Sequence, residues 1–111
     1  MRFPVLPNGE PGEPETIAQG EDLFIIDGLT ADVRGTLYAA IIGQNKIVAV
    51  FPSTGEQIVL ASAEDGLDGP ASLTFGIGKY HVRTLFFTNY AVLSTEPEPG
   101  ILKMDLDWPA K

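Results

Sequence analysis

The sequence has 111 residues, which is room for one domain, because typical domains run to about 100–150 residues. Its net charge of −8, from 7 Lys and Arg against 15 Asp and Glu, disfavours nucleic acid and anionic membrane surfaces, which attract clusters of Lys and Arg. The absence of cysteine excludes disulfides, thiolate zinc sites and cysteine nucleophiles.

Short strands separated by turns are predicted along most of the chain. Helices are disfavoured because 12 Gly and 9 Pro interrupt the sequence too often for three helical turns. Runs of β-branched and aromatic residues predict strands over residues 36–42, 46–51 and 58–60. Residues 43–45 and 52–55 carry the Gly, Asn and Pro of tight turns, so these strands are expected to form hairpins.

The second half of the chain repeats the pattern of the first. Residues 27–31 match residues 71–75 at an offset of 44, and residues 37–40 match 85–88 at an offset of 48. Residues 47–50 match 101–104 at an offset of 54, which places the extra residues of the second unit in turns. A period of about 40–50 residues with three or four strands per unit is typical of β-propeller blades.

The repeat predicts an all-β fold, namely a partial β-propeller of about two four-stranded antiparallel blades. The single segment 1–111 divides into the end of a preceding blade (1–18), one blade (23–60) and a final blade (67–106). Residues 15–18 are expected to form the outer strand of the preceding blade, and residues 3–5 the tail of a still earlier strand.

Two blades cannot close a ring, and open blades leave sheet edges exposed. We therefore expect either missing blades in a longer chain or a homo-oligomer in which copies complete the ring, three copies supplying about six blades. A small open sandwich that covers its edges with the Pro-rich and acidic termini is the third alternative.

Two groups of residues indicate a family. Residues 26–32, 35–40 and 46–50 resemble the late blades of the senescence-marker-protein/gluconolactonase/luciferin-regenerating-enzyme-like family. Residues 69–76 and 85–91 are similar to the final blade of that family. The resemblance extends from about Ile17 to Leu106 and implies a six-bladed propeller, of which this sequence holds the C-terminal two blades.

The resemblance implies a divalent cation, with calcium as the expected metal, in a central channel where lactones or related esters are hydrolysed. Asp27 matches the family's metal ligand and proposed general base, so it is the candidate catalytic and metal-binding residue. Without the resemblance, Asp27 is an Asp-Gly turn residue that leads into a strand. The family's remaining ligands, an early Glu and a mid-chain Asn, have no counterpart here, and Ala71 at the position that repeats Asp27 cannot bind metal.

Other polar residues carry weaker signals. His81, the only histidine, is expected in a surface loop or at a channel mouth, so histidine-based triads are excluded. Asn89 could orient a ligand or cap a turn. Ser72 and Ser94 lack the glycines of a nucleophile elbow. Residues 64–69 are acidic but lack the spacing of a calcium loop, and they are expected to form a solvated connection between blades.

Two functions follow as hypotheses. The first is a metal-dependent lactonase or esterase in which Asp27 is completed by other blades or copies, the isolated monomer being inactive. The second is a non-catalytic, self-assembling propeller module with a binding or structural role. No apolar run approaches the roughly 18 residues of a membrane span, so we expect a soluble protein, cytoplasmic or secreted.

Overall fold

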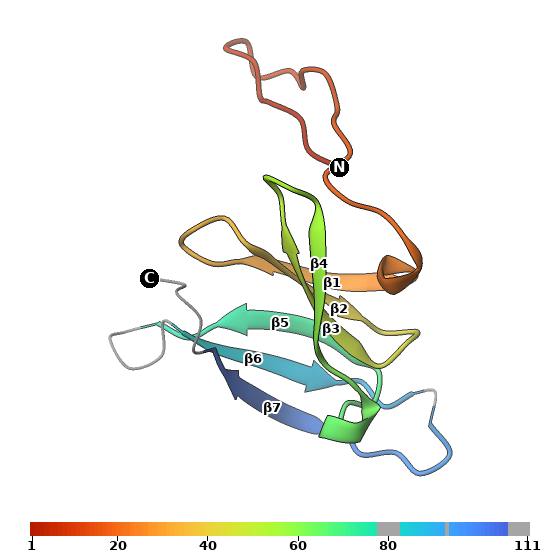
Figure 1. Ribbon diagram of the computed structural model, residues 1–111. Coiled ribbons are helices and arrows are strands. Elements are labelled where there is room, and N and C mark those ends of the chain that lie inside the picture. Colours follow the sequence, from red (N-terminus) through yellow and green to blue (C-terminus); the bar gives the residue numbers. More distant parts are fainter. Residues whose placement is uncertain (78–82, 93, 107–111) are drawn as a thin grey trace.

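The computed structural model describes residues 1–77, 83–92 and 94–106. Within these residues the chain forms seven strands and two single-turn 3-10 helices (Figure 1). No helix of this described part has the length and apolar character to cross a membrane. The elements are η1 (Glu21–Leu23), β1 (Ile26–Ala31), β2 (Leu37–Ile41), β3 (Lys46–Phe51), β4 (Glu56–Ala61), η2 (Ala63–Asp65), β5 (Pro70–Phe75), β6 (Thr84–Asn89) and β7 (Gly100–Asp105).

The strands form two antiparallel sheets with the order β1-β2-β3-β4 and β5-β6-β7. This confirms the prediction of an all-β, antiparallel chain with almost no helix. The second sheet has three strands in the described residues, β5, β6 and β7, where about four were predicted for each blade. Both sheets are open in the described part of the chain, so no ring of blades is formed within it.

The internal repeat has a direct structural counterpart. β1 and β5 begin 44 positions apart, at Ile26 and Pro70, and β3 and β7 begin 54 positions apart, at Lys46 and Gly100. β2 and β6 hold the middle matched segments, residues 37–40 and 85–88. Because pairing along each sheet follows the same order, the two units share one strand arrangement.

The core lies between the two sheets, which pack face to face. Tyr38 of β2 is fully buried and meets Phe75 of β5 edge to face, with ring centroids 5.1 Å apart and planes at 79°. Alternate residues of the strands supply the rest of this core. Its buried members are Tyr38, Ala40, Ile47, Ala49, Ala61, Leu67, Leu73, Leu85, Phe87 and Leu106.

The first strands of the two sheets, β1 and β5, lie against each other with little side chain between them. A Cβ atom added at Gly28 would collide with the carbonyl oxygen of Ala71 and would lie 3.0 Å from the Cα atom of Ser72. Glycine at position 28 therefore permits backbone-to-backbone contact between the sheets.

The first 16 residues form a narrow arm that projects from the sheets (Figure 1). The prediction of strands at residues 3–5 and 15–18 is wrong, since this region contains only isolated bridges, Arg2 with Glu15 and Val5 with Pro11. Pro4 accounts for the difference at residues 3–5, because proline has no N–H to donate to a ladder. Ile17 and Ala18 instead pack on the outer face of the first sheet.

We expect Gly28→Ala to lower the free energy of unfolding by about 1–3 kcal/mol, because the added methyl group forces β1 away from β5. Urea unfolding followed by circular dichroism measures the change. Gly100→Ala is the matched control, since nothing lies within 4 Å of a Cβ at that strand position. Equal stability of the two variants would show that β1 and β5 are not held in close contact.

Candidate functional site

Asp27, the predicted catalytic and metal-binding residue, occupies a β-bulge at the start of β1. Ile26 pairs with Ile41 and Gly28 with Ala40, so Asp27 is the extra residue between two ladder positions. Its side chain is exposed, and it forms no hydrogen bond or ion pair with any residue of the described ranges. Bulges re-aim side chains and are common beside functional sites, so this carboxylate is available to a ligand.

The corresponding strand of the second sheet has an irregularity at the same place. The register of β5 with β6 shifts between Pro70 and Leu73, a stretch that includes Ala71. Both repeats therefore open with a distorted first strand, but only β1 places a carboxylate there. Ala71 has no side-chain group that can bind a metal.

Asp27 lies at the end of the molecule where the connections of both sheets gather, called the loop end below. Residues 42–45, 62–69, 90–92 and 94–99 lie there, because β1, β3, β5 and β7 begin and β2, β4 and β6 end on this side. The loop end contains a polar cavity of about 410 Å³. Its lining is Ile42, Gly43, Asn45, Asp68, Ser94 and Thr95, and it does not include Asp27.

Two asparagines hold the loop end together. The Oδ1 atom of Asn45, in the β2–β3 turn, accepts a hydrogen bond of 2.7 Å from the backbone N–H of Gly69, in the connection between the sheets. The backbone of Asn45 is left-handed, with φ of 53°, a conformation that asparagine tolerates better than most residues. The turn of the first sheet is thereby tied to the entry into the second.

Asn89 is buried and its amide is fully used inside the chain. Oδ1 accepts a hydrogen bond of 2.9 Å from the N–H of Asp68, while Nδ2 donates to the carbonyl oxygens of Gly66 and Glu98 at 2.9 and 3.0 Å. The sequence left two roles open for Asn89, to orient a ligand or to cap a turn. The structure shows the capping role, in which the side chain binds the backbone of two loops.

The acidic connection 64–69 joins the two sheets, as predicted, but it is only partly solvated, since Leu67 and Gly69 are buried. Its carboxylates bind groups of the loop end. Ser62 and Asp65 form a reciprocal capping box around η2. Oδ2 of Asp68 accepts a hydrogen bond of 2.8 Å from the N–H of Glu98. These side chains are structural, and none of them approaches the arrangement of a calcium loop.

Asp32 is a structural residue that the sequence analysis missed. Its Oδ1 atom accepts hydrogen bonds from the N–H groups of Arg34 and Thr36 at 2.9 and 3.0 Å, and Oδ2 accepts one of 2.8 Å from the hydroxyl of Tyr38. An Asp followed by Gly35 is a recognisable signal for such a turn. Asp32 thereby stabilises both the β1–β2 turn and the buried end of Tyr38.

The fit of a metal ion to this chain can be tested from its acidic residues. Calcium takes 6–8 oxygen ligands, of which Asp27 can supply one or two. No group of three or more His, Cys, Asp or Glu residues that could hold a metal is found in the described residues. The described residues alone therefore do not form a calcium site. His81 falls outside the described ranges, and Ser72 is an exposed residue of β5.

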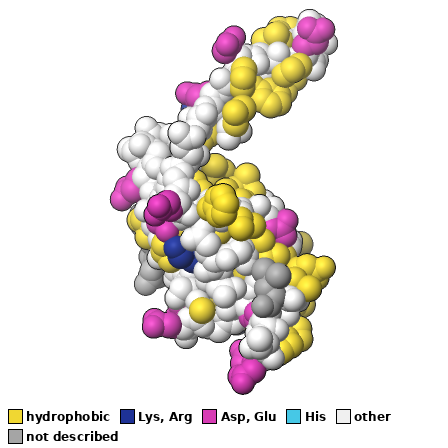
Figure 2. Space-filling view, turned by 90° about the vertical axis from the view of Figure 1, so that its right-hand side faces the viewer, with side chains coloured by type: hydrophobic (Ala, Val, Ile, Leu, Met, Phe, Trp, Pro, Cys, Tyr) yellow, Lys and Arg dark blue, Asp and Glu magenta, His cyan; other side chains and the backbone are white. Residues whose placement is uncertain are grey.

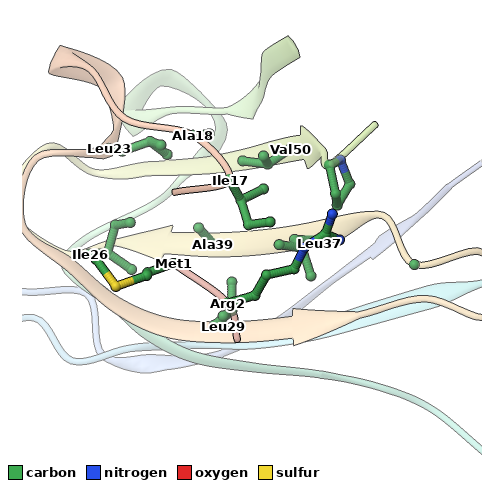
Figure 3. A pocket seen from close by; sticks show the side chains of 12 residues that line it. Met1, Arg2, Ile17, Ala18, Leu23, Ile26, Leu29, Leu37, Ala39 and Val50 are labelled. Atoms are coloured by element: carbon green, nitrogen blue, oxygen red, sulfur yellow. The ribbon is translucent and has the colours of Figure 1, made fainter. Parts of the chain in front are cut away.

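A second candidate site is an apolar cavity of about 370 Å³ on the outer face of the first sheet, called the outer groove below. Figure 3 shows its side chains projecting from β1, β2 and β3 beneath residues of the N-terminal segment. Its lining is Met1, Arg2, Ile17, Ala18, Leu23, Ile26, Leu29, Gly35, Leu37, Ala39, Val50 and Pro52.

The sequence matches no protein-family model and no curated protein. Two features of the structure remain from which a function can be inferred. One is the exposed carboxylate of Asp27 at the loop end, and the other is the apolar surface of the outer groove.

We expect Asn89→Ala to lower the free energy of unfolding by about 1–3 kcal/mol, because it leaves buried polar groups of two loops without partners. Thermal or urea unfolding measures the loss. Asn8→Ala, which removes one hydrogen bond in the exposed arm, is the control and should change stability by less than about 0.5 kcal/mol. If Asn89→Ala is as stable as the wild type, the fold does not need this amide, and Asn89 is again a candidate ligand-binding residue.

Proposed function

We propose that this chain supplies Asp27 to a metal-dependent centre that hydrolyses lactones or related esters, of the gluconolactonase-like kind. Further β-propeller blades complete the centre, either in additional polypeptide or in other copies of the chain. The isolated monomer is then inactive, and the expected metal is calcium.

The bulge at Asp27 is the observation that carries this proposal. It takes one carboxylate out of the β1–β2 ladder and leaves it exposed and without an internal partner in the described residues. A carboxylate committed to stabilising the fold would be expected to have such a partner, as Asp32 and Asp68 have. The resemblance of residues 26–32 to a family ligand motif supports the same role.

The packing of the two sheets supports a propeller-like arrangement. In a propeller, the first strands of successive blades surround a central channel and lie next to each other. β1 and β5, the first strands of the two repeats, are in contact here, and the chain passes from β4 through η2 to β5. A carboxylate at the start of β1 would then face other blades across the channel, where the missing oxygen ligands would have to reside.

The alternative is a non-catalytic module that assembles with copies of itself. Two observations favour it: Ala71 replaces the carboxylate in the second repeat, and the outer groove exposes apolar side chains such as Leu29. Both proposals require more blades than this chain holds, and they differ in whether Asp27 takes part in a reaction.

We expect the associated protein, isolated by size-exclusion chromatography, to hydrolyse a simple δ-lactone only when calcium or another divalent cation is added. Asp27→Asn should reduce this rate by about 10²–10⁴-fold, the range typical for the loss of a positioned acid–base group. The unfolding transition of Asp27→Asn should match that of the wild type, because the side chain is exposed and forms no hydrogen bond or ion pair with any described residue.

Glu64→Gln is the control, since Glu64 is an exposed acidic residue of η2 and its loss changes the net charge equally. It should retain the wild-type rate. If the associated wild-type protein is inactive with calcium, magnesium, manganese and zinc alike, the catalytic proposal is overturned and the assembly module stands.

A further inference from the structure

We infer that the outer groove is the docking site for the N-terminal arm of a second copy of this chain, and that two copies exchange arms reciprocally. This inference concerns how copies associate. It does not depend on any chemistry at Asp27, so either proposal can fail without the other.

The arm carries apolar side chains with nothing to cover them. Val5 is 73% exposed, Phe3 50% and Leu6 41%, although all three are large and hydrophobic. Figure 2 shows hydrophobic side chains along the arm, which stands away from the rest of the molecule. Apolar side chains grouped on a projecting segment indicate an interaction site rather than a solvated surface.

The arm is held in its projecting form by contacts at its base. The backbones of Arg2 and Glu15 exchange hydrogen bonds of 2.7 and 2.6 Å, and their side chains form an ion pair of 2.7 Å. Gly12 donates a further hydrogen bond of 2.6 Å to the carbonyl oxygen of Pro4. The arm is therefore a structured hairpin rather than a loose tail.

The arm cannot fill the outer groove of its own chain. Both of its ends already lie at the groove, since the lining includes Met1 and Arg2, which begin the arm, and Ile17 and Ala18, which follow it. The tip, residues 6–9, is carried away from the sheets (Figure 1). An arm tip that fills the outer groove must therefore belong to another molecule.

The outer groove provides the complementary apolar surface. Leu29 and Ile26, from the edge strand β1, are 61% and 45% exposed at its margin, while Ala39 and Val50 are buried at its floor. Prolines in both halves of the arm prevent it from adding to β1 as a continuous strand, so contact through side chains is the mode that remains.

Charge favours the arm over other occupants. A second hollow, lined in part by Arg2 and Arg34, shares Arg2, Gly35 and Pro52 with the outer groove and is therefore continuous with it. The returning half of the arm has the opposite sign, because residues 8–14 contain Glu10 and Glu13 and no Lys or Arg. Arg2 is already ion-paired with Glu15 at the base of its own arm, so the positive charge of this hollow comes from Arg34, opposite in sign to the acidic residues of a second arm.

The size of the contact indicates exchange in both directions. A stable interface buries roughly 800 Å² on each partner, more than the few apolar side chains of one arm can supply. Two arms docked reciprocally double the contact and close the assembly with two-fold symmetry, which leaves neither groove open for further growth.

The first test measures mass by sedimentation equilibrium. The wild-type protein should form a dimer, and both Val5→Asp on the arm and Leu29→Asp in the groove should weaken it at least tenfold. Ile101→Asp is the matched control, since Ile101 is 78% exposed on the outer face of the second sheet, and it should dimerise as wild type. A monomeric wild type at 100 µM, or a dimer weakened equally by Ile101→Asp, would overturn the inference.

The second test uses the absence of native cysteine and does not depend on the stability of a charged variant. Leu6→Cys and Leu29→Cys are prepared separately, mixed and oxidised in air. Arm exchange predicts a disulfide heterodimer as the main product. When Ile101→Cys replaces Leu29→Cys in the mixture, little disulfide heterodimer should form. If the mixture yields only homodimers, or if a dimer persists in Val5→Asp, the groove is covered by something other than the arm.

Discussion

The contact of β1 with β5 at Gly28 determines how the rest of the molecule is arranged. Because no side chain separates the two backbones there, the sheets approach closely enough for Tyr38 to meet Phe75. The same approach brings the β2–β3 turn within hydrogen-bonding distance of the connection between the sheets, where Asn45 binds the N–H of Gly69. The loop end, with its polar cavity, is a consequence of that contact.

The two sheets differ in how their outer faces meet solvent. β7 alternates strictly, with Leu102 and Met104 toward the core and Ile101, Lys103 and Asp105 exposed, as expected for a sheet with one wet face. β2 and β3 are buried on both faces, because Ile17, Ala18 and Leu23 pack on their outer side. This cover does not extend over β1, where Ile26 and Leu29 stay exposed at the margin of the outer groove.

The strands and the repeat could be predicted because they depend on local alternation and turn residues, and the offsets of 44 and 54 reproduce the strand starts. The position of Ile17 and Ala18 could not, since their apolar side chains look the same in the sequence whether the segment pairs in a sheet or packs on one. The roles of Asp32 and Asn89 depend on partners that folding brings together, Asp68 lying 21 positions from Asn89. Asp27 was found through a sequence resemblance, and its bulge is visible only in the strand register.

β1 connects the two candidate sites. Ile26 and Leu29 line the outer groove, and Asp27 is the bulged residue between them. A segment docked in the groove would therefore lie within a few residues of the exposed carboxylate. Since no group of three or more His, Cys, Asp or Glu residues that could hold a metal is found among the described residues, any further ligands around Asp27 have to come from whatever packs along β1. Association of the chain and any chemistry at Asp27 are thus constrained by the same edge strand.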